Sequence, residues 1–540
     1  MITGSGKSVC DGIAIGKIFL YKKQEQHFEK HSIADVESEL KRFQEAKETA
    51  IKQLKELYDK VVKDAGEEEA MIMEIHQMLL GDEDFNESIE EKIRVNKVNA
   101  ECAIEETKEE FAAIFSAMDD EYMKGRAADI KDISNRVINI LSGTQLNFTM
   151  SEPMIIVAED LAPSETVQFD KDKILAFVTK EGSSNSHTAI LARTMNIPSI
   201  VQANIEINDD LNGKVMVVDG VNGHYYIEPD EDTMVELTKL KENFGKETEE
   251  LNKLKGLEDI TADGKKIKLY SNIGNVEDLK KVLENDSQGI GLFRSEFLYL
   301  GRDTYPTEEE QFLAYKEVAS KMEGKKVIIR TLDIGADKQA DYFELDKEEN
   351  PAMGLRAIRI CLKRPEIFKT QLRAIYRASA YGNISIMFPM IIDVEEIRAI
   401  KEIIKNVQME LKAEGIEYKD VEIGIMIETP ASVIVSDDLA KEVDFFSVGT
   451  NDLTQYTLAI DRQNQKLDSF YNPHHKAILR MLKMVVDNAH ANGIWAGICG
   501  ELGADLELTE TFLKMGFDEL SVSPGKTLRL RKKIRETKLS

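Results

Sequence analysis

Two stretches of the C-terminal half carry the pattern that decides the fold, Ile423-Gly-Ile-Met-Ile-Glu428 and Phe445-Phe-Ser-Val-Gly-Thr-Asn-Asp452. Each is a short apolar run followed by a carboxylate, which is typical of a buried parallel strand with a functional group at its carboxyl end. From residue 265 onwards such runs alternate with longer helical patterns. They lie at Ile267–Ile273, Gly289–Phe293, Val327–Arg330, Ile384–Met390, Ile423–Ile427, Phe445–Val448, Ile494–Ile498 and Leu520–Val522. Eight strands in roughly 270 residues predict a (β/α)8 barrel, with a doubly wound sheet as the alternative.

Polar residues follow five of these eight runs, at the end of the barrel where active sites lie. They are Arg294, Arg330, Glu428, Asn451 with Asp452, and Cys499, and Arg462 follows a few residues beyond the sixth run. Arginines offer forked donors to phosphate oxygens. Two carboxylates without histidine or cysteine suit a hard cation such as Mg²⁺, and a cysteine thiol can donate a proton. The set predicts a metal-bound substrate that carries phosphate and carboxylate groups, with a carbon or enolate to protonate.

In the N-terminal half the hydrophobic pattern changes twice, from strand-like to helical and back to strand-like. Residues 9–21 predict short strands with glycine turns, and residues 33–143 are helical, with four amphipathic segments at about 36–57, 71–79, 100–118 and 130–141. Strand patterns return at Pro153–Val157, Ile174–Val178 and Val215–Val218, and Asn222-Gly223 predicts a hairpin. The order predicts a compact helical domain inserted into a small α/β domain.

A second candidate centre is Glu181-Gly-Ser-Ser-Asn-Ser-His187, a small-residue loop that leads into a predicted helix. With Asn185 or Ser186 as the N-cap, His187 stands in the first turn, where free backbone N–H groups and the helix dipole favour an anion. A neutral imidazole there can attack phosphorus, and the helix end would stabilise the phosphohistidine. His76 and the pair His474-His475 lack this setting and are interpreted as structural.

Composition limits the classes of protein to consider. The chain has 540 residues and a formal net charge of −28, which argues against a nucleic acid as the main partner. Four widely spaced cysteines without a metal-site spacing predict reduced, intracellular thiols. The first residues contain no signal-peptide core, and no apolar stretch reaches the roughly 18 residues of a spanning helix. We therefore expect a cytoplasmic protein without membrane insertion.

The longer motifs resemble enzyme I of the bacterial phosphoenolpyruvate:sugar phosphotransferase system over essentially the whole chain. The resemblance includes Gly12-Ile-Ala-Ile-Gly-Lys17, Arg126-Ala-Ala-Asp-Ile130 and the His187 segment. In the barrel it includes Gly291–Leu298, Arg330–Lys338, Asn350–Arg356, Gly424–Pro430, Phe446–Tyr456 and Gly497–Glu501. The family's fold is a swivelling phosphohistidine α/β domain with an inserted helical bundle, followed by a TIM barrel. The resemblance places the α/β domain at 1–24 and 146–229, the helical domain at 25–145, a linker helix at 230–260 and the barrel at 261–540.

The resemblance also implies roles. His187 would be phosphorylated on Nε2, and Arg294, Arg330, Asn451, Asp452 and Arg462 would bind phosphoenolpyruvate. Glu428 and Asp452 would ligate Mg²⁺, Cys499 would protonate the enolate carbon to give pyruvate, and Arg356 would line the same pocket. The helical domain would bind the carrier protein HPr, which accepts the phosphoryl group as the first step of sugar uptake. The barrel would form a homodimer.

The loop before His187 departs from the family's usual Gly-Gly-Arg-Thr-Ser-His, since here it reads Gly182-Ser-Ser-Asn-Ser-His187. The histidine is kept, whereas Ser184 and Asn185 stand where the family has arginine and threonine. Because the two centres lie in different predicted domains, the histidine domain must move, and the charged helix at 230–257 is the expected hinge region.

Two alternatives remain open at this stage. Pyruvate phosphate dikinase and phosphoenolpyruvate synthase share the histidine domain and the barrel, but they need a large ATP-binding domain before the histidine domain. Here only about 150 residues precede it, and they are predicted to be helical. A non-catalytic paralogue that binds HPr is the other alternative, and the presence of Glu428, Asp452 and Cys499 argues against it.

Overall fold

The computed structural model places the chain in two compact units, Met1–Thr248 and Glu249–Ser540. It describes residues 1–22, 28, 30–64, 67–116, 121–143, 150, 152–161, 163–166, 169–182, 188–189, 192, 197–300, 302–335, 340–346, 348–462, 464, 467 and 470–539. No helix within these ranges combines the length and the apolar character needed to cross a membrane.

The first unit contains an eight-stranded mixed sheet with the order β1-β8-β7-β3-β4-β5-β6-β2. Its strands are β1 (Ile2–Ser5), β2 (Lys7–Cys10), β3 (Ile13–Tyr21), β4 (Met154–Ala158), β5 (Ile174–Thr179), β6 (Ser199–Val201), β7 (Val215–Asp219) and β8 (His224–Ile227). The hairpin at Asn222-Gly223 is confirmed, because β7 and β8 pair with Asp219 opposite His224 and Gly223 has φ +70°. The sequence did not predict β1 and β6, which are only 4 and 3 residues long and show no clear alternation.

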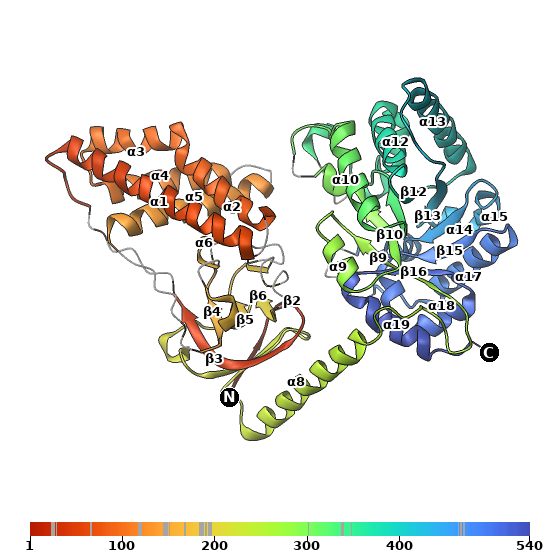
Figure 1. The fold of residues 1–540 in the computed structure, drawn as a ribbon, viewed down its shortest axis with the longest axis horizontal. Helices are drawn as coiled ribbons and strands as arrows, with labels where there is room; N and C mark the ends of the chain where they lie inside the picture. Colours follow the sequence, from red (N-terminus) through yellow and green to blue (C-terminus); the bar gives the residue numbers. More distant parts are fainter. Residues whose placement is uncertain are drawn as a thin grey trace. The chain divides into compact units, whose positions relative to one another are not determined.

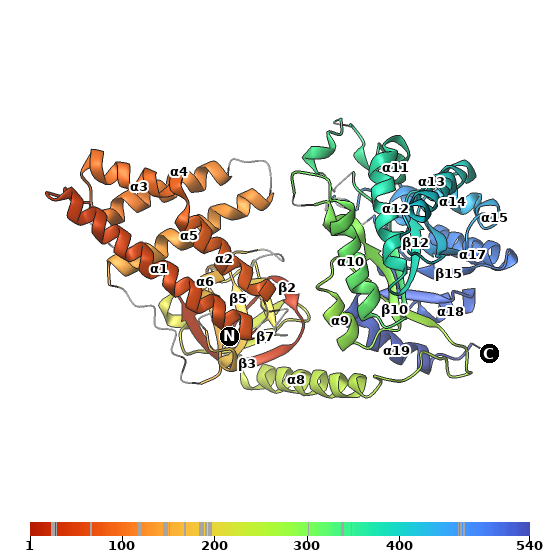
Figure 2. The ribbon, with the colours of Figure 1, turned by 45° about the horizontal axis from the view of Figure 1, so that its top comes forward.

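Between β3 and β4 the described part of the chain forms five helices, which pack on one another in Figure 2. They are α1 (Val36–Asp64), α2 (Glu67–Gly81), α3 (Glu83–Asn96), α4 (Ala100–Ser116) and α5 (Glu121–Leu141). The expected number of four was wrong, because α3 was overlooked. Only Asp82 separates α3 from α2, and it caps α3 by accepting a hydrogen bond from the Phe85 N–H group at 2.9 Å. Phe85, Ile89 and Ile93 give α3 a buried stripe that is a single residue wide.

The predicted connecting helix is present as α8 (Glu231–Asn252), after the short α6 (Pro163–Thr166). Leu237 of α8 is buried against Ile13 and Val217 of the sheet. The chain beyond α8 is held by the second unit, because the Arg531 guanidinium donates to the Leu254 carbonyl at 3.0 Å and to Asp259 Oδ1 at 2.6 Å. The boundary between the two units thus falls inside α8, between two anchored segments.

The second unit is a closed parallel barrel, which rules out the doubly wound alternative. Its strands are β9 (Lys268–Ile273), β10 (Gly289–Arg294), β11 (Lys326–Arg330), β12 (Asn383–Phe388), β13 (Glu422–Ile427), β14 (Phe445–Val448), β15 (Trp495–Ile498) and β16 (Glu519–Val522). All eight predicted strands are confirmed. Figure 1 shows helices surrounding these strands. They are α9 (Leu279–Glu284), α10 (Glu308–Lys321), α11 (Ile358–Lys363), α12 (Pro365–Ser379), α13 (Val394–Ala413), α14 (Pro430–Ile434), α15 (Ser436–Leu439), α16 (Thr450–Leu458), α17 (Lys476–Ala491), α18 (Thr509–Met515) and α19 (Thr527–Glu536).

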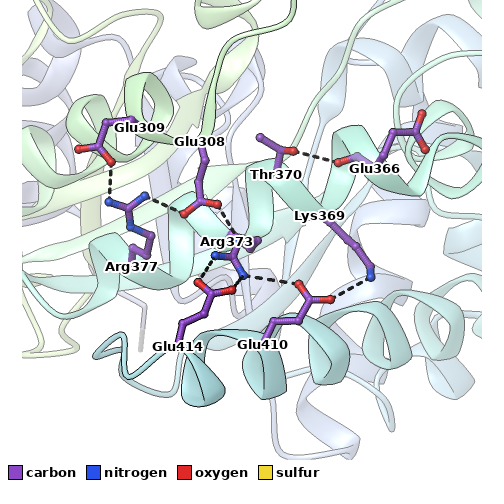
Figure 3. A network of polar contacts seen from close by, with 9 residues as sticks. All are labelled: Glu308, Glu309, Glu366, Lys369, Thr370, Arg373, Arg377, Glu410 and Glu414. Carbon is purple, nitrogen blue, oxygen red and sulfur yellow. Dashed lines mark hydrogen bonds and ion pairs between the residues drawn. The ribbon is translucent and has the colours of Figure 1, made fainter.

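A network of ion pairs joins α10, α12 and α13 on the outside of the barrel (Figure 3). Arg373 of α12 donates to Glu308 Oε2 of α10 at 2.6 Å and to Glu414 Oε2, just beyond α13, at 2.6 Å. Arg377, one turn further along α12, donates to Glu308 Oε1 at 2.7 Å and to Glu309 Oε2 at 2.6 Å. Arg373 therefore links α12 to α10 and to the end of α13.

We expect Arg373→Ala to lower the free energy of unfolding of the barrel by about 1–2 kcal/mol, because a half-buried guanidinium with several charged partners is lost. Thermal unfolding at low salt measures the change. Lys369→Ala is the matched control, since Lys369 is on the same helix and forms a single ion pair among the described residues, with Glu410 at 3.2 Å. A loss in Arg373→Ala no larger than that in Lys369→Ala would show that the network does not hold the helices together.

Candidate functional site

The carboxyl ends of the barrel strands bring two arginines together around a shared carboxylate. Arg330, the last residue of β11, is buried and pairs with Glu296, and its guanidinium lies 3.1 Å from Asp333 Oδ2. Arg356 is also buried and lies 2.8 Å from Asp333 Oδ1. Asp333 thus contacts both arginines, and the ion pairs hold each guanidinium in a defined position.

Arg356 connects this arginine pair to the acidic side of the site. Its Nη1 lies 4.0 Å from Asp452 Oδ1 and donates to the Tyr456 hydroxyl at 3.2 Å. The Tyr456 hydroxyl in turn donates to the Ala352 carbonyl, which ties the segment before Arg356 to α16. Arg356 thus contacts residues on both sides of this end of the barrel, and its role in binding stays a prediction.

Glu428 follows β13 and has no exposed surface. Its Oε1 accepts a hydrogen bond from the Met390 N–H group at 2.6 Å, whereas Oε2 is buried without a hydrogen-bond partner in the described residues. Burial raises the pKa of Glu428, and the charges of Asp452 and Asp333 raise it further, while Arg330 and Arg356 oppose them. Within the part of the chain that the structure describes, no ion pair joins Glu428 directly to a basic side chain, although Arg330 and Arg356 act on it electrostatically.

The helix α16 supplies the remaining polar residues at this end of the barrel. Asn451 and Asp452 are in its first turn rather than on the strand, and Gly449 provides the close approach, since a Cβ there would lie 2.9 Å from Glu428 Oε2. Asp452 Oδ1 lies 3.8 Å from Arg462 Nη2. Asn451 Oδ1 accepts a hydrogen bond from the Glu501 N–H group at 3.2 Å, which joins α16 to the loop after β15.

Cys499 follows β15 and is 2% exposed. Its thiol donates to the Val448 carbonyl at 3.7 Å. Burial raises the pKa of this thiol to about 12, against the smaller opposing effect of Ser447. The thiol is therefore protonated at neutral pH, as a proton donor must be.

The described structure brings together Arg330, Glu428, Asp452, Arg462 and Arg356 through the contacts above, with Asn451 and Cys499 on adjoining segments. Arg294, the exposed last residue of β10, is the strand-register partner of Arg330. His187 lies outside the described residues, so its predicted place at a helix end stays a prediction. Among the described residues of that segment, Thr188 is buried and donates to the Leu161 carbonyl at 3.4 Å.

Reasoning from the sequence did not single out Glu296, Asp333 or Tyr456. Each lies within a motif that carries the family resemblance, and Asp333 is three residues after Arg330. The available signal was an acidic residue close in sequence to an arginine at a strand end. The pattern of strand ends alone does not distinguish such an acidic residue from an ordinary polar residue in a loop.

The donor set fits a cation that is only partly held by protein. Within the described ranges no group of three His, Cys, Asp or Glu side chains converges as a metal site. Glu428 and Asp452 instead form a pair of carboxylates, one with an unpartnered buried oxygen. Mg²⁺ commonly takes one or two carboxylates and completes its shell with water and substrate oxygens, so these residues fit it.

Comparison with known families assigns all three parts of the chain. Residues 248–539 match the phosphoenolpyruvate-binding domain of the PEP-utilising enzymes. Residues 5–126 match the N-terminal domain of these enzymes, and residues 150–223 match their mobile domain.

Relatives match nearly the whole chain. A Phosphoenolpyruvate-protein phosphotransferase of Listeria monocytogenes is 44% identical over 533 residues, which cover 98% of this chain and 93% of the relative. Proteins of the same name are 44% identical in Haemophilus influenzae, with 98% of this chain and 93% of the relative covered, and 43% identical in Bacillus subtilis, with 99% and 94% covered. The chain therefore belongs to the phosphoenolpyruvate-protein phosphotransferases, the enzyme I family.

Proposed function

We propose that this protein transfers the phosphoryl group of phosphoenolpyruvate to its own His187 and then to HPr, and that it releases pyruvate as the first step of sugar uptake. The observation that carries the proposal is the convergence of buried Arg330 and Arg356 with Glu428 and Asp452 at the carboxyl end of the barrel. The full-length similarity to phosphoenolpyruvate-protein phosphotransferases supports the same activity.

The arginines bind the phosphate and carboxylate groups of the substrate. Arg330 and Arg356 are already oriented by Glu296 and Asp333, so they need little rearrangement when an anion enters. Arg294 and Arg462 are more accessible and close around the same anion, and the Asn451 side chain adds a polar contact. Arg356 thus joins the residues that bind the substrate.

Glu428 and Asp452 would hold Mg²⁺ together with substrate oxygens and water. When bound, the ion supplies positive charge that polarises the phosphoryl group and stabilises the developing enolate. A bound cation would favour the charged form of the Glu428 carboxyl group.

Cys499 supplies the proton that completes the reaction. Its S–H bond breaks as a C–H bond forms at carbon 3 of the enolate, which gives pyruvate and leaves a thiolate. Because burial keeps the pKa of the thiol at about 12, the proton is present before each encounter with substrate. The His187 imidazole takes the phosphoryl group in line with the leaving enolate oxygen.

The resemblance further supports a homodimer formed through the barrel, a cytoplasmic location, and movement of the histidine domain about the region of α8. Sedimentation velocity of the purified chain tests the dimer. A single monomeric species across micromolar concentrations would be evidence against it. Distance measurements between labels on the two units, with and without phosphoenolpyruvate and Mg²⁺, test the movement. One unchanged distance would contradict it.

Incubation with [³²P]phosphoenolpyruvate and Mg²⁺ tests the activity itself. We expect acid-labile, base-stable label on the protein, its transfer to added HPr, and its absence from the His187→Ala variant, since phosphohistidine has this stability pattern. Label that requires ATP would indicate a dikinase. Binding of HPr without any label would indicate a non-catalytic paralogue, and either result would overturn the proposal.

A further inference from the structure

Gln371 is a polar side chain on the buried face of α12. The other buried positions of this helix are mostly apolar, and none of the Gln371 side chain is exposed. Burying a carboxamide group is costly unless its oxygen and its N–H groups find hydrogen-bond partners. The partners of Gln371 therefore indicate why the chain keeps a polar residue at this position.

The Gln371 carboxamide joins the ends of two neighbouring barrel strands. Its Oε1 accepts a hydrogen bond at 2.9 Å from the N–H group of Leu332, two residues beyond β11. Its Nε2 donates to the hydroxyl of Ser295, the first residue after β10, at 3.0 Å, and to the Tyr315 hydroxyl of α10 at 3.1 Å. The oxygen and both N–H groups of one buried amide are thus used to connect β10, β11 and α10.

The two connected segments carry residues that we propose bind the substrate. Ser295 stands between Arg294 and Glu296, and Leu332 is two residues after Arg330. Glu296 and Arg330 form an ion pair with each other. The carboxamide and this ion pair therefore join the same two segments.

The hydrogen bond to Leu332 also holds the residue that orients both buried arginines. Asp333 follows Leu332 directly, and its Oδ2 lies 3.1 Å from the Arg330 guanidinium while its Oδ1 lies 2.8 Å from that of Arg356. A displacement of this backbone would move Asp333 and change both ion pairs. Through this hydrogen bond, Gln371 is linked to two arginines of the site.

Backbone pairing between the two strands stops where these residues begin. The last register pair of β10 and β11 is Arg294 with Arg330. Beyond this pair one chain enters the 3₁₀ turn Ser295–Leu298 and the other enters a loop, and the Gln371 amide links them there. Substrate-binding side chains keep a productive geometry only when the residues around them are held in place.

We propose that Gln371 is a positioning residue that sets the spacing of Arg294 and Arg330 for the phosphate and carboxylate groups of phosphoenolpyruvate, an inference that rests on the proposed function. Gln371 acts through the two strand ends and does not touch the substrate. Glu428 and Asp452 come from β13 and α16, which are other segments of the barrel. Gln371 therefore acts on the binding of the substrate anion rather than on the binding of the cation.

Gln371→Met tests this proposal, because methionine has a similar length but cannot form the three hydrogen bonds. The probe is 2-phospholactate, which has the phosphate and carboxylate groups of phosphoenolpyruvate but no enol ester. By isothermal titration with Mg²⁺ present, we expect its Kd to rise at least about tenfold. The affinity for Mn²⁺, measured by electron paramagnetic resonance, should stay within about twofold, and in single-turnover labelling the half-saturating phosphoenolpyruvate concentration should rise by the same factor as the Kd.

Gln311→Met is the matched control, since Gln311 is also a buried glutamine with several hydrogen bonds. It lies on α10, accepts from the Tyr299 hydroxyl at 3.0 Å and donates to the Pro306 carbonyl at 3.2 Å, both further along the chain from Arg294. We expect Gln311→Met to lower the unfolding temperature as Gln371→Met does, with the Kd of 2-phospholactate unchanged.

Ser295→Ala is a milder second variant, and it provides the test if Gln371→Met does not fold. It removes only the hydrogen bond to the end of β10 and leaves the one to Leu332. We expect the Kd of 2-phospholactate to rise about threefold, because one of the two strand ends stays held.

The outcomes separate this inference from the proposed function. If the unsubstituted protein takes no label from phosphoenolpyruvate, the proposed function is wrong. If it is labelled, but the folded Gln371→Met or Ser295→Ala protein binds 2-phospholactate as tightly as the unsubstituted protein does, the positioning role alone is overturned. An equal loss of 2-phospholactate and Mn²⁺ affinity would also overturn it, since the whole site would then be disturbed.

Discussion

Replacing Glu428 by glutamine lowers the rate at which phosphoenolpyruvate phosphorylates the protein by about a thousandfold. The substitution removes one of two converging carboxylates but keeps the side-chain volume and the acceptor for the Met390 N–H group. Glu428 is fully buried, and its charge interacts with that of Asp452. The substitution therefore weakens cation binding and removes charge that stabilises the reacting phosphoryl group.

Two measurements check this result. Single-turnover labelling gives the rate, and Mn²⁺ titration followed by electron paramagnetic resonance gives metal affinity without any reaction, which we expect to fall by at least about tenfold. Glu402→Gln is the control, because Glu402 is an exposed carboxylate on α13. Unchanged Mn²⁺ affinity in Glu428→Gln would remove Glu428 from the metal site.

Replacing Arg531 by methionine lowers the free energy of unfolding by about 3–5 kcal/mol. The guanidinium has no exposed surface and binds four groups, Asp259 Oδ1 and Asp286 Oδ2 at 2.6 Å each, the Asp286 carbonyl at 2.7 Å and the Leu254 carbonyl at 3.0 Å. Burial raises the pKa of Asp259 to about 6, and Arg531 opposes that rise. Without Arg531 the buried Asp259 loses its compensating charge.

The loss of unfolding free energy in Arg531→Met depends on pH. In the variant the pKa of Asp259 rises further, so at pH 5 the carboxyl group is protonated and little charge is left uncompensated, whereas at pH 8 ionisation has a large cost. Urea unfolding at both values should show the larger difference from the unsubstituted protein at pH 8. Lys532→Met, next to Arg531 with a 41% exposed side chain, is the control. A deficit that is equal at the two pH values would show that lost packing, not charge, causes it.

Periodicity predicted most of the fold because most elements have enough residues to show it. The eight barrel strands alternate with helices and each is a nearly continuous apolar run, as parallel strands covered on both sides must be. Helix α3 shows little periodicity because its buried apolar residues are Phe85, Ile89 and Ile93, with the polar Asn86 buried beside them. The strands β1 and β6 are defined by their neighbours in the sheet rather than by their own residues.

The candidate site likewise contains residues that the sequence predicted and residues that it did not. Arg330, Glu428, Asp452 and Cys499 could be named because each follows a predicted strand, and the ends of parallel strands meet at one end of a barrel. Arg356 and Asp333 come from loops, and Glu296 from the single 3₁₀ turn Ser295–Leu298, and side-chain directions in such segments follow no long period. Which carboxylate pairs with which arginine, and which of them stays unpartnered, therefore could not be derived from spacing.

The amino-acid order alone determined the sequence of domains, the barrel and the residue types at its functional end, since these depend on local periodicity and on the chemistry of individual side chains. Only the folded chain decided that the buried Glu519 side chain lies against the distant Gly291 and Gly497, and that Arg531 anchors the segment after α8. Both depend on contacts between residues far apart in the chain, and the burial that sets their protonation arises only when all eight strands close around them.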